Sequence, residues 1–319
     1  MNLHARFAAL VASLVVAGAA AAQDYPNKPV RLILGLVAGG SYDAIHRALA
    51  DKLKDRWKQP VIVENRPGAA MQIAGEFVAR SAPDGYTILA GGSSFPLAKY
   101  AMKLNYDPVK ELALVARTSI VPYVFVASNN VPVKNMAEYI AYAKANPGKV
   151  SLGVVVVGAG DHLAGLLLEK LTGTQFNYIV YKGAAAAMPE LLNGQLDSRV
   201  DAYGSWKPHH DAGKARILAA STLKRLSFAP DVPTVAEIVP GYEAVGSTGI
   251  SVAAGTPRAI IDRIARDLAE VLKDPEVRQR FLSLGWEPDF ADGPTYTAIL
   301  TKEEQLYGPI LIGLGIKPQ

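Results

Sequence analysis

Short apolar runs alternate with stretches of helical spacing along most of the chain. The runs at residues 30–36, 61–64 and 86–90 have the length and β-branched content of buried strands, with helix-like stretches between them. Because parallel neighbouring strands need a crossover, this alternation predicts a parallel α/β sheet. It restarts near residue 121, with further strands expected at residues 123–128, 150–157, 179–181, 198–201 and 217–220.

The clearest helix signal follows Gly255. We expect Thr256 to be its N-cap and Pro257 its first residue, followed by an apolar stripe at positions 260, 261, 264, 268, 271 and 272. The whole pattern predicts two lobes, residues 23–124 plus 246–319 and residues 125–245, so that the chain crosses between them twice. A cleft between two such lobes is a common place for a ligand site.

Residues 1–22 have the pattern of a secretory signal peptide. A short start containing Arg6 precedes an apolar run at residues 7–16, and Ala20-Ala21-Ala22 precedes Gln23. The apolar run is too short to span a bilayer. We therefore expect an exported protein whose signal peptide is removed after about Ala22.

The composition excludes several classes of protein. Of the 319 residues, 50% are hydrophobic and 19% are charged, which is typical of a globular chain and not of a disordered one. There is no cysteine, so the sequence has no thiol nucleophile, disulfide, iron–sulfur cluster or thiolate zinc site. The net charge of +4 is spread without a Lys/Arg block, which argues against a protein that binds nucleic acid.

The first candidate site follows the first predicted strand and consists of Gly39, Gly40, Ser41, Tyr42 and Asp43. Backbone N–H groups at a helix start have no intrahelical partner, and the helix dipole makes that end positive. Glycines let the backbone approach a ligand, so this loop is suited to binding a carboxylate or phosphate. The alternative is a tight turn in which Ser41 or Asp43 only caps the helix.

A second loop of the same kind follows the predicted strand at residues 150–157. Its candidate residues are Val157, Gly158, Ala159, Gly160, Asp161 and His162. The glycine spacing departs from the dinucleotide fingerprint G-x-G-x-x-G, and no acidic residue ends the next strand, so nucleotide binding is disfavoured. His162 is expected either to contact a ligand or to pack at the helix start. No motif predicts a metal site or a cofactor.

Three more candidates follow other predicted strands. Ser93 and Ser94 come after Gly91-Gly92, and Asp201 ends a strand of the second lobe. The carboxyl ends of parallel strands are where open α/β sheets bind ligands. Asp201 is expected either to face the cleft or to cap the next element.

Ordered motifs cover nearly the whole chain after residue 22. They include Lys28-Pro29-Val30-Arg31, Gly39-Gly40-Ser41 with Asp43, Val63-Glu64-Asn65-Arg66-Pro67-Gly68-Ala69, Ala82-Pro83-Asp84-Gly85-Tyr86-Thr87, His162-Leu163-Ala164-Gly165, Tyr181-Lys182-Gly183, Asp231-Val232-Pro233-Thr234-Val235-Ala236-Glu237 and Gly255-Thr256-Pro257. Together they resemble the periplasmic solute-binding proteins of the tripartite tricarboxylate transporters, also called TctC or Bug proteins.

The resemblance implies a type II, Venus-flytrap α/β fold with a mostly parallel sheet in each lobe that binds a ligand without catalysis or a cofactor. The mild charge and the predicted signal peptide suit a monomer. In such proteins the loops matching residues 39–43 and 154–162 close on a small carboxylate. The implied location is the periplasm, and the implied partners are the membrane permease components of a tripartite transporter. A subunit that presents the solute to a membrane histidine kinase is an alternative. A secreted α/β hydrolase is a remote one, because the sequence has no nucleophile elbow.

The departures from the family lie at the expected pocket. Residues 154–157 are four valines where the family usually has small and hydroxyl residues, and residues 69–72 replace a glycine-rich run with two alanines, a methionine and a glutamine. Asp161 would repel an anion unless it turns away as a cap or the ligand brings a donor group. We expect a small organic acid with an apolar body, contacted by the valines, Met71, Tyr42 and Trp206.

Overall fold

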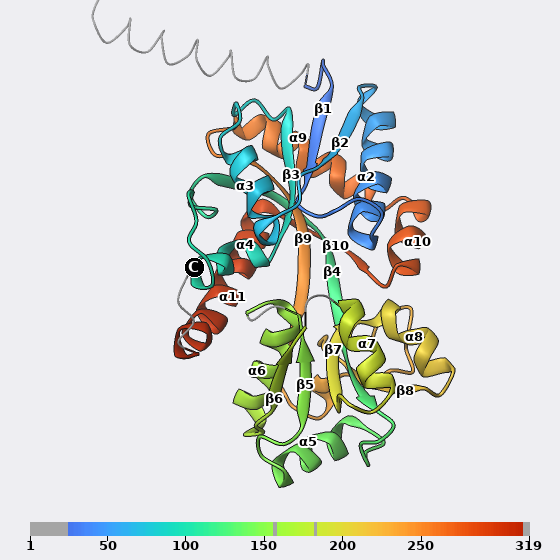
Figure 1. Cartoon of the computed structure of the whole chain (residues 1–319). Coiled ribbons are helices and arrows are strands. Elements are labelled where there is room, and N and C mark those ends of the chain that lie inside the picture. The colour runs from blue at the N-terminus through green and yellow to red at the C-terminus, as the bar shows by residue number, and fades with distance from the viewer. Residues whose placement is uncertain (1–24, 156–157, 182–183, 315–319) are drawn as a thin grey trace, which may run out of the picture.

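The computed structural model describes residues 25–155, 158–181 and 184–314, which form two α/β lobes one above the other (Figure 1). The predicted signal peptide lies outside the described residues. The sheet of the upper lobe has the order β2–β1–β3–β9–β4, with β10 also paired to β4. Its strands are β1 (Val30–Leu34), β2 (Val61–Asn65), β3 (Thr87–Gly92), β4 (Leu112–Ser128), β9 (Val245–Ala253) and β10 (Glu287–Asp292).

The lower lobe contains a second set of strands. They are β5 (Ser151–Val154), β6 (Asn177–Val180), β7 (Ser198–Ala202) and β8 (Ala215–Ala220). In each lobe the outer strands pair in parallel, as β1 does with β2 and β3, and β5 with β6 and β7. The predicted parallel sheets are confirmed for these strands, whereas β4, β9 and β10 pair antiparallel with their neighbours.

Strand β4 takes part in both sheets. Residues 112–122 pair with β9, and residues 123–127 continue into the lower lobe, where they pair with β7. Only the second half of β4 was expected from the sequence, because the first half carries Thr118 and Ser119 at fully buried positions. The Ser119 and Thr248 hydroxyls lie 2.8 Å apart, so these polar side chains satisfy each other between the two crossing strands.

Helices cover both sheets. Those near the upper sheet are α2 (Ser41–Trp57), α3 (Gln72–Ala79), α4 (Ser94–Leu97), α9 (Arg258–Val271) and α10 (Pro275–Ser283), with 3-10 turns η1 (Ala69–Met71) and η2 (Ala98–Tyr100). The remaining ones are α5 (Met136–Ala145), α6 (Gly160–Thr172), α7 (Ala184–Leu192), α8 (Tyr203–Asp211), η3 (Val235–Glu237) and the last helix, α11 (Gly293–Gly313). None of the described helices is both long enough and apolar enough to cross a membrane.

The predicted apolar stripe of α9 is confirmed at Ile260, Ile264 and Leu268, which are buried against the upper sheet. The predicted cap is wrong. Pro257 occupies the N-cap position, and the Thr256 hydroxyl donates to the Ala253 carbonyl at 2.7 Å instead of accepting from the helix. Since Thr256 belongs to the turn that leaves β9, its local hydrogen bond competes with capping.

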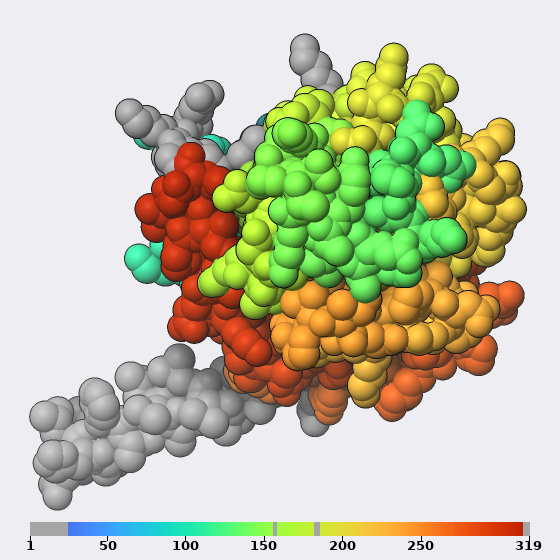
Figure 2. Space-filling model, turned by 90° about the horizontal axis from the view of Figure 1, so that it is seen from below, coloured from blue at the N-terminus to red at the C-terminus, as the bar shows by residue number. Residues whose placement is uncertain are grey.

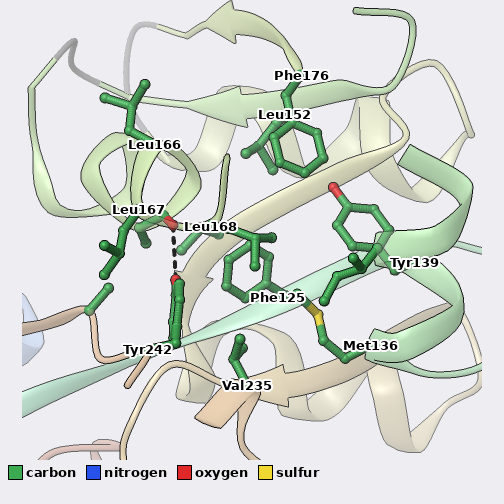
Figure 3. Close-up of a cluster of buried hydrophobic side chains, with 14 of the residues drawn as sticks. Phe125, Met136, Tyr139, Leu152, Leu166, Leu167, Leu168, Phe176, Val235 and Tyr242 are labelled. Atoms are coloured by element: carbon green, nitrogen blue, oxygen red, sulfur yellow. Dashed lines mark hydrogen bonds between the residues drawn. The ribbon is translucent and has the colours of Figure 1, made fainter. Parts of the chain in front are cut away.

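The core of the lower lobe is built around the end of β4 (Figure 3). Phe125 packs against Tyr242, with ring centroids 6.1 Å apart, and Tyr139 stacks on Phe176 at 5.7 Å. The Tyr242 hydroxyl donates to the Ala164 carbonyl of α6 at 2.9 Å, so a buried polar group is satisfied inside the core. These contacts fix α6 relative to β4, and therefore fix the loop that precedes α6.

The last helix, α11, contacts both lobes. It packs on the first half of β4 and on α4, while its Tyr307 and Leu311 belong to the core cluster of the lower lobe. Figure 2 shows α11 in red beside the yellow-green residues of that lobe. The C-terminal helix therefore lies along the boundary between the lobes.

The segment before α3 is strained. Three consecutive non-glycine residues, Ala69, Ala70 and Met71, have positive φ values of 45°, 48° and 72°. Left-handed backbone costs an L residue about 1–2 kcal/mol, so this segment stores conformational energy. A Cβ atom at Gly35 would collide with the Met71 side chain, so only glycine permits this close approach.

Replacing Ala70 by glycine relieves that strain. We expect Ala70→Gly to raise the free energy of unfolding by about 1 kcal/mol, measured by urea denaturation. The matched control is Ala141→Gly in the exposed interior of α5, where glycine should lower stability by about 1 kcal/mol. A loss of stability from Ala70→Gly would show that the left-handed conformation is not strained.

Candidate functional site

A cavity of about 340 Å³, called the central cavity below, lies where β3 ends, where β4 and β9 cross between the lobes and where α6 begins. Its apolar wall includes Leu36, Met71, Leu97, Met102, Val121, Leu163 and Trp286. Its polar wall consists of Tyr42, Ser93, Ser94, Tyr123, Gly158, Ala159, Gly160, Ser247, Thr248, Glu303 and Tyr307, together with backbone from neighbouring residues. The cavity therefore combines one apolar side with hydroxyl groups and a helix start.

The conformation of the first candidate loop is fixed by hydrogen bonds to the Asp43 carboxylate. The Asp43 carboxylate accepts the Gly39 N–H at 3.1 Å, the Arg47 guanidinium at 2.8 Å and the Asn65 amide at 3.0 Å. The bond from Arg47 leads the interactions that lower the pKa of Asp43 to about 2, so this group stays ionised. Asp43 thus shapes the loop and does not line the cavity. The tight turn of the alternative is present, but neither Ser41 nor Asp43 caps α2, whose N-cap is Gly40 without a side-chain hydrogen bond.

Tyr42 brings the first loop to the central cavity. It is the one member of residues 39–43 that lines the cavity, and its hydroxyl donates to the Ala90 carbonyl of β3 at 2.7 Å. Gly39, Gly40 and Ser41 are exposed beside it. The N–H groups of Ser41 and Tyr42 belong to the first turn of α2, where the helix supplies no acceptor.

The second candidate loop is held in the same way by Asp161. Its carboxylate accepts the Val155 N–H at 2.6 Å, and burial raises its pKa. The Asp161 side chain does not line the cavity, as the first alternative proposed, but it is no cap: the N-cap of α6 is Ala159, without a side-chain hydrogen bond. Gly158, Ala159 and Gly160 line the cavity instead.

His162 packs at the start of α6 and does not line the cavity. Its Nδ1 atom accepts the Gly158 N–H at 2.9 Å, and its ring meets Tyr178 edge-on at 4.6 Å. Burial lowers the pKa of His162 to about 4, so the ring is neutral at pH 7. This arrangement is the packing alternative stated for a lone histidine, and it fixes the loop conformation.

Ser93 and Ser94 lie at the cavity as expected for residues that follow a strand. The Ser247 N–H donates to the Ser93 hydroxyl at 3.2 Å, which joins the end of β3 to β9. Ser94 is exposed at the start of α4. Both serines can offer a hydroxyl proton to a ligand.

Two further residues of the sequence prediction, Asp201 and Trp206, do not line the central cavity either. The Asp201 carboxylate accepts the Trp206 indole N–H at 3.0 Å and pairs with Arg199 at 3.0 Å. It neither faces the cavity nor caps α8, whose N-cap is Ala202 without a side-chain hydrogen bond. Trp206 is fully buried in the lower lobe, so the apolar contact expected from it is wrong; Trp286 lines the cavity in its place. Val157 lies outside the described residues.

Sequence reasoning missed Tyr123, a residue of β4. Its hydroxyl touches the position where a Cβ of Gly160 would be, so only glycine fits between Tyr123 and the first turn of α6. No described residue hydrogen-bonds this hydroxyl, which faces the central cavity. The one feature of the sequence that could have identified it is its position directly after Pro122, in the strand that passes from one lobe to the other.

Sequence reasoning also missed Glu303, which comes from α11. Among the described lining residues it is the one charged side chain. Burial raises the pKa of Glu303 to about 7, Glu243 adds to the increase, and Arg117 opposes it. Glu303 lies in a run of polar and charged residues, which is the pattern of a solvent-exposed helix face. The sequence therefore did not indicate that this side chain faces a cavity.

Another cavity, of about 320 Å³, lies under α11 and is lined by β4, β9, α4 and α9 of the upper lobe. It takes no residue from the lower lobe, whereas the central cavity takes residues from both. Within the described residues, no group of three His, Asp or Glu side chains is arranged to hold a metal ion.

Comparison with known proteins agrees with this arrangement. The sequence model of the tripartite tricarboxylate transporter family receptor matches residues 45–316. BugT of Bordetella pertussis is 33% identical over 326 residues, covering 99% of this chain and 99% of BugT. The solved R. palustris Rpa4515 with adipate is 28% identical with a TM-score of 0.78, covering 93% of this chain and 100% of that one. MatC from Rhodopseudomonas palustris with bound malate is 25% identical with a TM-score of 0.72, covering 90% and 100%.

These similarities extend over nearly the whole chain and include the two-lobed fold. They confirm the predicted fold class, and the relatives are periplasmic binding proteins that act as receptors and not as enzymes. The chain belongs to the tripartite tricarboxylate transporter receptor family, the TctC or Bug proteins.

Proposed function

We propose that this receptor captures a small organic acid in the central cavity and delivers it for membrane uptake. The observation that carries the proposal is the meeting of two helix starts, at α2 and α6, with hydroxyl groups and one apolar wall around about 340 Å³. Such helix starts favour an anion, and the cavity is large enough for a short-chain acid. Solved relatives hold adipate and malate, which are both carboxylates.

The carboxylate of the ligand would be held by backbone N–H groups near Ser41 and Gly160 and by the hydroxyls of Ser93, Ser94 and Tyr123. Hydrogen bonds to a charged group contribute about 1.5–3 kcal/mol each. Four or five of them, less the costs of ordering and desolvation, suffice for a micromolar complex at about −8 kcal/mol. Met71 and Trp286 would cover the apolar body of the acid.

Binding would shift an equilibrium between open and closed arrangements of the lobes. We take residues 23–124 plus 246–319 and residues 125–245 as the two units that move. A ligand that contacts both loops binds the closed arrangement better than the open one, and so increases its population. The crossing strands β4 and β9 would bend between the lobes.

The protein would act in the periplasm after removal of residues 1–22. Permease components of a tripartite transporter would receive the ligand. A membrane histidine kinase is the alternative partner, and the genes beside this one separate the two: permease genes support uptake, and a kinase gene supports sensing.

Closure can be measured directly. The experiment is small-angle X-ray scattering on the chain without residues 1–22. We expect its radius of gyration to decrease when a mono- or dicarboxylate that binds is added. Uncharged amides of the same carbon skeletons are the control and should leave it unchanged. Tight acid binding with no change in radius would contradict closure.

Tyr123 tests the site within the cavity. Tyr123→Phe should weaken acid binding about tenfold, by isothermal titration calorimetry, because a charge-assisted hydrogen bond is lost. The melting temperature of the ligand-free protein should stay nearly the same, since no described residue uses this hydroxyl. The matched control is Tyr139→Phe, which removes a 2.6 Å bond to Ser198 and should lower stability without changing affinity. Unchanged affinity in Tyr123→Phe would remove Tyr123 from the site.

A further inference from the structure

Two neighbouring glutamates of α11 have opposite surroundings. Glu304 pairs with Lys99 and accepts the Tyr100 hydroxyl at 3.1 Å, outside the central cavity. Glu303, one residue earlier, faces the central cavity and makes no hydrogen bond or ion pair with any described residue. A half-buried carboxyl without a partner is costly to keep ionised, so this position requires an explanation.

The charges around Glu303 do not neutralise it. Arg117 of β4 is the cation that acts on it, but Arg117 is already paired with Asp289 of β10. Glu243, which precedes β9, adds a second negative charge, and Lys302 acts on Glu243. The other titratable groups that face Glu303 are the hydroxyls of Tyr123, Tyr296 and Tyr307.

A ligand that offers only carboxylates meets an obstacle in this cavity. Its negative charge would lie beside Glu303 within the same 340 Å³, and no described lysine, arginine or histidine lines the walls to offset it. Like charges at short distance repel strongly in a partly buried site. A ligand that also carries a proton donor would instead satisfy the unpaired carboxylate.

Building on the proposed function, we infer that Glu303 selects acids that carry a second group able to donate a hydrogen bond, best a cationic amino group. The carboxylate of such a ligand occupies the helix starts and its amino group contacts Glu303. Glu303 is then a specificity-determining residue, and a dicarboxylate binds well only when Glu303 is protonated.

The sign of the pH dependence follows from this assignment. An ammonium group stabilises ionised Glu303 and lowers its pKa, so binding releases a proton when pH is below about 7. Affinity for an amino acid should therefore rise about tenfold between pH 6 and pH 8. A second carboxylate raises the pKa of Glu303, so affinity for a diacid should fall over the same range.

The test uses acids of matched length: butanoate, 4-aminobutanoate and succinate, and hexanoate, 6-aminohexanoate and adipate. We expect calorimetry at pH 8 to give the amino acid of at least one length an affinity at least tenfold above that of its diacid. In Glu303→Gln this preference and the pH dependence should both be lost. Because glutamine removes an unpaired charge, the ligand-free variant should melt at the same temperature as the wild type or higher at pH 8.

Two further variants are controls. Glu304→Gln alters the adjacent paired carboxylate and should keep the preference and the pH profile. Glu243→Gln removes a neighbouring charge that does not line the cavity, so it should move the midpoint of the profile to lower pH and keep the preference.

The two possible failures differ. If the acids bind with the same order of affinity in the wild type and in Glu303→Gln, the assignment of Glu303 is wrong while the proposed function stands. If none of the six acids binds to the wild type at either pH, the proposed function fails and the assignment falls with it.

Discussion

Strand β4 (Leu112–Ser128) belongs to both sheets, and the walls of the central cavity depend on it. Its pairing with β9 in the upper lobe and with β7 in the lower lobe fixes where the two lobes face each other. Phe125 anchors one end in the lower core, while the buried hydroxyls of Ser119 and Thr248 pair where the strands cross. Tyr123 lies in β4 between these two points. Because β4 runs without a break from the upper sheet into the lower one, Tyr123 is placed beside Gly160 at the start of α6.

The two loops at the cavity share one physical device. In each, a carboxylate near the start of a helix accepts an N–H group of the preceding loop: Asp43 takes that of Gly39, and Asp161 takes that of Val155. These carboxylates satisfy backbone donors of the loops, while the N–H groups at the start of each helix have no intrahelical acceptor. A negatively charged residue beside an anion site is therefore consistent with anion binding, provided that its oxygens are used elsewhere.

The sequence predicted the features that depend on local pattern. Glycine-rich loops after buried strands identified both helix starts, because strand, loop and helix follow one another along the chain. It did not predict Tyr123, Glu303 or Trp286, because these come from a crossing strand and from segments near the C-terminus that only tertiary packing brings to the cavity. Trp206 was expected at the ligand because it follows the end of a strand closely in the sequence. Tertiary packing instead buries it in the lower lobe, where its indole N–H donates to Asp201.

The cavity thus contains positive helix ends and one unpaired carboxyl, and the ligand has to match both. The measurement that tests this most directly is a crystal structure of the protein with bound 6-aminohexanoate. The account predicts its carboxylate within hydrogen-bond distance of the N–H groups that start α2 and α6, inside the central cavity. A ligand found under α11 in the other cavity, or with its carboxylate turned away from both helix starts, would contradict it.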